Sequence, residues 1–289
     1  MHKLDGHTRT CGLIGNPVAH TLSPMIQNHM AEVTGENLVY VPFPVAQGDL
    51  DAAIKGALAL DLLGLNVTVP YKSDVLTTLA EIDPLAERIG AVNTLVRCEG
   101  GYKGYNTDMP GLYRAMCEDG VEVTGRDVVI LGAGGVARAV AVMLQDKGAK
   151  HVYILNRTID KAAAVAEEVN RIAGKTFAYA YTLADYDKIP GDRWLVIQAT
   201  SVGMHPHVEN VVIEEPAFYQ HVETGYDLIF NPGVTRFMKL VREAGGEAYN
   251  GAKMLVYQGI IAFELWTGAS ISRDTADELC RMMEQALAQ

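Results

Sequence analysis

The chain has 289 residues, which predicts about two domains at roughly 150 residues each. Hydrophobic residues make up 49% and charged residues 20%, a composition typical of folded soluble proteins that excludes a disordered, collagenous or coiled-coil chain. Acidic residues outnumber basic ones by 35 to 24, and the net charge of −11 would repel a nucleic-acid backbone. The longest apolar stretch, 128–137, is far shorter than the roughly 20 residues of a membrane span. We therefore expect neither a nucleic-acid nor a membrane partner.

The cysteines and histidines indicate no metal site. No two cysteines form a CxxC pair, so free thiols in a reducing cytoplasm are expected. The cysteines are Cys11, Cys98, Cys117 and Cys280. His205 and His207 flank Pro206 without further ligands at metal-binding spacing, and we interpret them as loop residues. No apolar run of the secretory kind follows the first residues, which again favours a cytoplasmic location.

Strand-like apolar runs alternate with helical patterns along the whole chain. This alternation predicts an α/β fold in which parallel strands are joined by crossover helices. The first strand is expected over 10–14. Ser23 and Pro24 then predict a helix start, with Ser23 as the N-cap and Pro24 in the first turn.

The next strand is expected over 65–69, where apolar and polar residues alternate until Pro70 ends the pattern. Apolar residues at helical spacing over 75–82 predict a helix after it. Lys72 would then lie in the first turn of that helix, where the positive end of the helix dipole disfavours a cation. On local grounds Lys72 is either an indifferent surface lysine or a functional residue.

Three other polar residues stand at positions that need an explanation. Asp108 precedes a helical segment and suits an N-cap. Asn93 interrupts the apolar run 89–96, and Gln258 shares a helical stripe with Ile261, so both amides are expected to point inward. A buried amide must find hydrogen-bond partners. Asn93 and Gln258 are therefore each either a hydrogen-bonded core amide or a functional group.

A second segment begins with the apolar run 128–131, which predicts a strand buried on both faces. A helix over 136–147, the stop residue Gly148 and a strand over 151–155 complete a βαβ unit. The turn between the first strand and the helix fits GxGxxG/A, the pattern that lets backbone amides approach a pyrophosphate. It consists of Gly132, Ala133, Gly134, Gly135, Val136 and Ala137.

The end of the following strand indicates which dinucleotide is bound. An NAD-preferring fold usually has an acid there for the ribose 2′-hydroxyl. This chain has Asn156, Arg157 and Thr158 instead, with Lys161 one helical turn further on. A guanidinium pairs bidentately with phosphate, so the sequence favours NADP over NAD.

Taken together, these motifs resemble the shikimate dehydrogenase family, which includes the quinate/shikimate dehydrogenases. The similarity extends from about Gly12 to Gly268. It is carried by GNP and HTLSP near the start, NVTVPYK at 66–72, GAVNT at 90–94, NTD at 106–108, the glycine loop with NRT, ATS at 199–201, and the GxxML run before Gln258.

The resemblance implies that Lys72 and Asp108 are the catalytic pair. Asp108 could orient Lys72, relay the proton or stabilise the ammonium form of Lys72, and the sequence leaves these three roles open. It implies substrate contacts at Thr21, Ser23, Asn66, Thr68, Asn93, Tyr226 and Gln258. It implies cofactor contacts at the six loop residues and at Asn156, Arg157, Thr158, Lys161, Thr200, Ser201, Gly251 and Met254.

The implied activity is reversible, NADP-dependent oxidation of the small molecule shikimate to 3-dehydroshikimate. The implied architecture is an α/β substrate domain over 1–110, a Rossmann-type NADP-binding domain over 111–250, and C-terminal helices over 251–289 that pack back on the first domain. The segment 120–125 is either a hinge or a simple turn. The oligomeric state stays open, with a homodimer as one option.

Three departures from the family pattern leave alternatives open. Thr21 stands where serine is more frequent, which allows a preference for quinate. Gln198 stands where asparagine is common, and Lys161 replaces a frequent arginine, which weakens the preference for NADP over NAD. A non-catalytic NADP-sensing protein is a further alternative, although the presence of both Lys72 and Asp108 argues against it.

Overall fold

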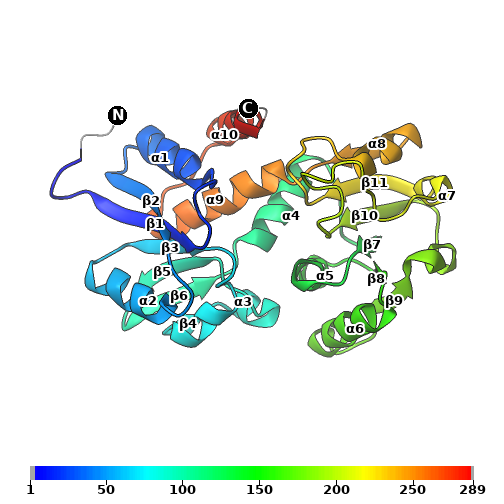
Figure 1. Ribbon diagram of the computed structural model, residues 1–289, viewed down its shortest axis with the longest axis horizontal. Coiled ribbons are helices and arrows are strands. Elements are labelled where there is room, and N and C mark those ends of the chain that lie inside the picture. The colour runs from blue at the N-terminus through cyan, green and yellow to red at the C-terminus, as the bar shows by residue number, and fades with distance from the viewer. Residues whose placement is uncertain (1–3, 288–289) are drawn as a thin grey trace. The chain divides into compact units, whose positions relative to one another are not determined.

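The computed structural model describes residues 4–287 and divides into two compact units. Within the described residues, one unit is 4–111 together with Leu255–Met283, and the other is Leu112–Met254 together with 284–287. Each unit contains its own six-stranded sheet with helices packed against it (Figure 1). The predicted α/β class is confirmed.

The sheet of the first unit is mixed, with the order β2-β1-β3-β5-β6-β4. Its strands are β1 (Arg9–Gly15), β2 (Leu38–Pro44), β3 (Gly64–Val67), β4 (Glu81–Ile82), β5 (Thr94–Cys98) and β6 (Gly101–Tyr105). The helical elements of this part are α1 (Ser23–Thr34), α2 (Leu50–Ala59), the 3-10 helix η1 (Asp74–Thr78), α3 (Pro84–Ile89), α9 (Ala252–Thr267) and α10 (Arg273–Leu287). Helix α4 (Asp108–Glu118) begins in this unit and continues into the other.

The central strand β3 separates an apolar face from a polar one. Leu65 and Val67 lie in the buried core of the first unit, as the alternating pattern predicts. Asn66 projects from the opposite face and lies directly across from Thr94 in the antiparallel pairing of β3 with β5. Helix α9 is held on the same sheet by the indole N–H of Trp266, which donates to a backbone carbonyl of β5 at 2.8 Å.

The prediction of a helix over 75–82 is wrong. The chain instead forms the short η1 and then β4, which pairs in parallel with β6. Thr77 and Thr78 are β-branched and favour a helix weakly, and their hydroxyls donate to backbone carbonyls within η1. Strand β3 also ends two residues early, and Val69 is 66% exposed. Lys72 therefore lies in the turn before η1 and not in a helix.

The sheet of the second unit is entirely parallel, with the order β12-β11-β10-β7-β8-β9. Its strands are β7 (Asp127–Leu131), β8 (His151–Asn156), β9 (Ala178–Thr182), β10 (Trp194–Gln198), β11 (Val222–Asp227) and β12 (Glu247–Tyr249). Its helices are α5 (Gly135–Asp146), α6 (Ile159–Ala173), the 3-10 helix η2 (Leu183–Lys188), α7 (Pro216–Tyr219) and α8 (Arg236–Glu243).

This strand order is the doubly wound pattern of dinucleotide-binding sheets. Strand β7 has β8 on one side and β10 on the other, so the order reverses beside β7 (Figure 1). Ligands of such sheets bind at the carboxyl ends of the strands at this reversal. The predicted buried strand over 128–131, the helix after it and the stop at Gly148, which has φ of +77°, are confirmed.

Candidate active site

Lys72 is placed by the turn between β3 and η1. Its backbone carbonyl accepts a hydrogen bond from the N–H of Val92 at 2.8 Å, which fixes this turn to the segment before β5. The ammonium Nζ lies 2.7 Å from Oδ2 of Asp108. The side chains are 34% and 18% exposed, so the ion pair is partly shielded from water while Lys72 keeps an open side.

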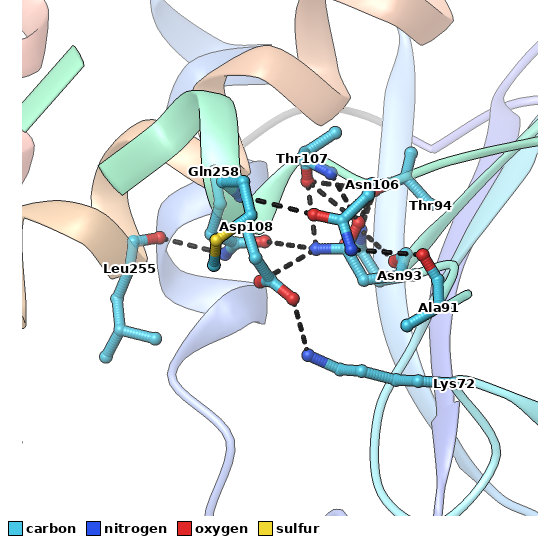
Figure 2. Close-up of polar contacts among 11 residues, drawn as sticks. Lys72, Ala91, Asn93, Thr94, Asn106, Thr107, Asp108, Leu255 and Gln258 are labelled. Atoms are coloured by element: carbon cyan, nitrogen blue, oxygen red, sulfur yellow. Dashed lines mark hydrogen bonds and ion pairs between the residues drawn. The ribbon is translucent and has the colours of Figure 1, made fainter. Parts of the chain in front are cut away.

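Asp108 is the first residue of α4, but it does not cap the helix. Asn106 performs that function, because its Oδ1 accepts a hydrogen bond from the backbone N–H of Met109 at 3.2 Å. The interpretation of Asp108 as an N-cap is therefore wrong. Both of its carboxylate oxygens face polar side chains instead, Oδ2 toward Lys72 and Oδ1 toward Nδ2 of Asn93 at 2.9 Å (Figure 2).

Asn93 is the centre of a buried hydrogen-bond network (Figure 2). Its Oδ1 accepts from the backbone N–H of Thr107 at 2.7 Å and lies within hydrogen-bond distance of the hydroxyls of Thr107 and Thr94. Its Nδ2 donates to Asp108 and reaches Oε1 of Gln258 at 3.5 Å. The network supplies the partners that a buried amide requires. It joins five predicted site residues, namely Lys72, Asp108, Asn93, Gln258 and, through Thr94, Asn66.

Gln258 lies on α9 and is only half-buried, as is Ile261. Its Nε2 donates to the carbonyl of Leu255 at 2.8 Å, and its Oε1 faces Asn93. The expectation that Gln258 shares the core-facing stripe is wrong, because α9 is apolar on most of its circumference and the sequence does not single out the buried face. The buried side chains of α9 include Val256, Ile260 and Phe263.

The three hydroxyl residues with a predicted substrate role lie just after β1 and β3. The backbone N–H of Ser23 donates to Oγ1 of Thr21 at 3.2 Å, and the two hydroxyls are 3.1 Å apart. Ser23 is the first residue of α1 and Leu22 occupies the N-cap position, so the prediction that Ser23 caps this helix is wrong. Thr68 follows β3, and its methyl carbon lies so close to Gly15 that a Cβ there would approach it to 2.3 Å.

Asn66 is buried and both ends of its amide have protein partners. Its Oδ1 accepts from the hydroxyl of Tyr40 at 2.7 Å. Its Nδ2 donates to the backbone carbonyl of Asn93 at 3.2 Å and to Oγ1 of Thr94 at 3.0 Å. The structure therefore places Asn66 behind Asn93 and in contact with it.

The glycine loop of the second unit follows β7, and its first residue adopts a conformation that favours glycine. Gly132 has φ of +114°, and a Cβ there would approach a methyl carbon of Thr200 to 2.7 Å. Ala137 is fully buried, so a small residue lets α5 pack closely on the sheet. Ala133 lies half-buried between them.

The N-terminus of α5 is open. Gly134 is its N-cap residue and has no side chain to occupy the first helical N–H groups. A Cβ added at Gly134 or at Gly135 would meet no atom within 4 Å, and both glycines and Val136 are exposed. Unoccupied N–H groups and the positive end of the helix dipole bind phosphate well. This loop fits the pyrophosphate of a dinucleotide.

The cationic residues predicted for a 2′-phosphate follow β8. Asn156 donates from Nδ2 to the carbonyl of Thr158 at 2.9 Å, which folds the turn that presents Arg157. Arg157 and Lys161 are exposed, and neither forms an ion pair with another residue of the described range. Both cations are therefore free to receive a phosphate.

The loop after β10 is held by Gln198. Its Oε1 accepts from the backbone N–H of Thr200 at 2.6 Å, and its Nε2 donates to the carbonyl of Val202 at 3.2 Å. Thr200 is half-buried and Ser201 is exposed. The glutamine found in place of the family's usual asparagine thus shapes the segment that carries Thr200 and Ser201.

Asp227, at the end of β11, is a buried acid that sequence reasoning missed. It accepts hydrogen bonds from Gln198 at 3.2 Å, from the hydroxyl of Thr235 at 2.6 Å and from the backbone N–H of Ile229 at 3.0 Å. Burial raises its pKa to about 6, and these hydrogen bonds oppose the shift. Asp227 ties the loops after β10 and β11 together.

The remaining predicted residues also lie in the second unit. Tyr226 is fully buried on β11, and its hydroxyl donates to Oδ2 of Asp119 at 3.2 Å. Gly251 packs against the backbone of Leu228, where a Cβ would approach the carbonyl oxygen to 2.4 Å. Met254 is half-buried near the start of α9. The structure gives Tyr226 a hydrogen-bonded position within the second unit.

Sequence reasoning missed several polar residues that support this site. They are Tyr40, Thr94, Asn106, Thr107 and Asp227. The local signal that could have indicated these residues is a polar residue within or beside an apolar run, as Thr94 is within the run 89–96.

The described residues meet the requirements of neither a metal site nor a membrane-spanning helix. Within residues 4–287, no group of three or more histidine, cysteine or acidic side chains could hold a metal ion. His205 and His207 lie in a loop, as expected. No helix in the described part of the chain is long and apolar enough to cross a bilayer.

A doubly wound parallel sheet with an open glycine loop, and a lysine–carboxylate pair in a separate α/β unit, define a two-unit protein of the dinucleotide-binding class. Family models agree. Residues 13–95 match the shikimate dehydrogenase substrate binding domain, residues 116–215 the shikimate/quinate 5-dehydrogenase domain, and residues 251–279 the shikimate 5′-dehydrogenase C-terminal domain.

Individual proteins give the same result. The chain is 41% identical to a shikimate dehydrogenase (NADP(+)) of Carboxydothermus hydrogenoformans over 268 residues, 93% of this chain and 95% of the relative. A shikimate dehydrogenase solved with NADP+ is 35% identical, with a TM-score of 0.84 and coverage of 99% of this chain and 96% of the other. The shikimate 5-dehydrogenase of Listeria monocytogenes, solved with shikimate and NAD, is 30% identical, with a TM-score of 0.88 and coverage of 96% and 98%. The chain belongs to the shikimate dehydrogenase family, which confirms the resemblance seen in its motifs.

Proposed function

We propose that the chain is an NADP-dependent shikimate dehydrogenase that interconverts shikimate and 3-dehydroshikimate. The observation that carries this proposal is the Lys72–Asp108 pair, 2.7 Å apart and braced by Asn93. The family's curated relatives named as NADP-dependent shikimate dehydrogenases support it. In the cell, reduction of 3-dehydroshikimate would serve aromatic amino-acid biosynthesis.

Lys72 exchanges the proton in this mechanism. During oxidation it accepts the proton of the substrate hydroxyl, and during reduction its ammonium returns a proton to the carbonyl oxygen. Both oxygens of Asp108 already accept hydrogen bonds, from Lys72 and from Asn93. This arrangement favours orientation of Lys72 and stabilisation of its ammonium as the roles of Asp108, over a proton relay.

The substrate-binding residues form two groups, one suited to the carboxylate of the substrate and one suited to its ring hydroxyls. The paired hydroxyls of Thr21 and Ser23 donate to the substrate carboxylate. Asn93 and Gln258, with Thr68, hold the ring hydroxyls, because amides and hydroxyls both donate and accept. Asn66 and Tyr226 complete the substrate set that the family resemblance implies. Fixing the ring in this way supplies much of the rate by proximity and orientation.

The second unit holds the dinucleotide. When bound, the dinucleotide would supply the hydride acceptor for the substrate carbon. The glycine loop and the N-terminus of α5 bind the pyrophosphate. Asn156, Arg157, Thr158 and Lys161 receive the 2′-phosphate. The nicotinamide end is assigned to Thr200, Ser201, Gly251 and Met254.

We assign the substrate domain to 1–110, the NADP domain to 111–250, and 251–289 to helices that return to the substrate domain. We also propose a cytoplasmic homodimer. Light scattering on the eluate of a sizing column measures the oligomeric state, and a mass of about one chain would reject the dimer. Cell fractionation with a cytoplasmic marker enzyme tests the location.

Nicotinamide absorbance tests the function directly, with shikimate and quinate each assayed with NADP+ and with NAD+. The proposal predicts the highest kcat/KM for shikimate with NADP+. A higher value for quinate would assign Thr21 to quinate selection, and a higher value for NAD+ would reject the role given to Arg157. NADP binding without turnover in any combination would indicate a sensor.

A further inference from the structure

Tyr40 is a buried tyrosine on β2 that none of the motifs includes. It is 1% exposed, and its position is fixed from two sides. Its backbone N–H and carbonyl both bond to the side chain of Asn28 on α1, at 2.8 and 3.0 Å. Its ring contacts the ring of Trp266 on α9, with centroids 6.0 Å apart. The hydroxyl of Tyr40 is therefore held at a defined point of the first unit.

That hydroxyl is bonded to a buried amide. It donates its proton to Oδ1 of Asn66 at 2.7 Å. Burial raises the pKa of Tyr40 well above its ordinary value, so the hydroxyl keeps its proton and remains a donor.

Backbone groups fix the direction of the bonds beyond Tyr40. Nδ2 of Asn66 faces the backbone carbonyl of Asn93, which can only accept, so Oδ1 of Asn66 must face Tyr40. The backbone N–H of Thr107 can only donate, so the atom of Asn93 that it faces at 2.7 Å must be Oδ1. Nδ2 of Asn93 then points to Asp108. Neither amide can be reversed without breaking a bond to the backbone.

The bonds therefore run in one direction. Tyr40 donates to Asn66, Asn66 donates to Thr94, Thr94 donates to Asn93, and Asn93 donates to Asp108. Figure 2 shows the last part of this chain, where Asn93 bonds one oxygen of the Asp108 carboxylate and Lys72 bonds the other. Bonds aligned in this way polarise and strengthen one another.

We propose that Tyr40 is a positioning residue that orients the catalytic Asp108 through Asn66, Thr94 and Asn93. This inference rests on the proposed function, because that function makes Asp108 the partner of the proton-transferring Lys72. Removal of the Tyr40 hydroxyl leaves Oδ1 of Asn66 buried without its donor. The hydrogen bonds that hold Asn93, and through it Asp108, then loosen.

The test compares Tyr40→Phe with Tyr102→Phe in the full-length protein. Tyr102 is a matched control because it is equally buried in the same unit, and its hydroxyl makes one bond, to the carbonyl of Leu62 at 2.9 Å. We expect Tyr40→Phe to lower kcat about tenfold and to raise KM for shikimate about threefold, since a buried acceptor is left unpaired. KM for NADP+ stays within twofold. Tyr102→Phe lowers the melting temperature to a similar extent but leaves kcat and KM within twofold of wild type.

A second pair of variants covers the case in which Tyr40→Phe does not fold. Thr94→Val removes the fully buried hydroxyl downstream, whereas Thr94→Ser keeps it. The chain predicts that the valine variant loses about tenfold in kcat and that the serine variant stays within threefold of wild type. Equal kcat for the two, or an equal loss in Tyr40→Phe and Tyr102→Phe, would overturn the role of Tyr40. An inactive wild-type protein would instead refute the proposed function, so the two failures are distinguishable.

Discussion

Gly111 decides how closely α9 approaches α4, and Gly111→Ala tests that packing. A Cβ at position 111 would lie 2.6 Å from the backbone nitrogen of Gln258 and 2.9 Å from its Cα and Cβ. Carbon atoms in contact prefer about 3.5–4.0 Å, so α9 would have to move by about 1 Å. Because the obstacle is helix backbone, no side-chain rotation relieves the contact.

Overpacking of this kind costs about 1–3 kcal/mol, and the gain of alanine over glycine in a helix returns about 0.5–1 kcal/mol. We expect a net loss of about 1–2 kcal/mol in the free energy of unfolding. The contact from Asn93 to Gln258, already 3.5 Å, would break, so KM for shikimate should rise several-fold.

Urea unfolding followed by circular dichroism measures the stability, with Gly56→Ala as the matched control. Gly56 also lies inside a helix, but a Cβ there would meet no atom within 4 Å. We expect that control to gain about 0.5–1 kcal/mol. A Gly111→Ala protein as stable as Gly56→Ala would refute the close helix contact.

Two further substitutions test the second unit. Arg157→Ala should raise KM for NADP+ at least tenfold, because a charge-assisted bond is worth about 1.5–3 kcal/mol, while KM for NAD+ stays within twofold. The control is Arg171→Ala, which removes an exposed cation from the other end of α6; equal effects in both variants would reject the phosphate site. Burial raises the pKa of Asp227 to about 6 from an ordinary value of 3.8, so its contribution to stability is fully present below about pH 4 and is lost as the pH rises through 6. The free energy of unfolding of Asp227→Asn, relative to that of the wild type, should therefore rise by about 1–3 kcal/mol between pH 4.5 and pH 7. Thermal unfolding measures this difference, and a difference that does not change with pH would contradict the prediction.

The parts of the fold that the sequence predicts well are those determined by local burial. The run 128–131 is apolar on both faces because neighbouring strands and helices cover both, and Gly132 after it, with φ of +114°, forms the turn that glycine favours. The segment 75–82 shows the opposite case. Its apolar spacing suits a helix, but pairing of β4 with a strand some 20 residues away outweighs that weak local preference.

In the candidate site, too, some features depend on contacts between residues far apart in the sequence. Asn106 and Asp108 are both suitable capping residues, and no local rule tells which one caps α4. The choice depends on Lys72, which lies 36 residues upstream and attracts the carboxylate of Asp108. Tyr40 carries no local signal, because only the strand register that brings Asn66 opposite Thr94 gives its hydroxyl a role. Long-range pairing of this kind cannot be inferred from spacing.

The most direct test of the account is the kcat of Lys72→Ala with saturating shikimate and NADP+. Lys55→Ala is the matched control, because Lys55 is an exposed lysine of the same unit that also pairs with a carboxylate, 2.6 Å away on Asp51. Loss of a general acid-base group predicts a fall of about 10²–10⁴-fold for Lys72→Ala, with the dissociation constant of NADP+ unchanged. Lys55→Ala should keep full activity. A Lys72→Ala enzyme within threefold of wild type would show that the proton leaves by another route and would contradict the assigned site.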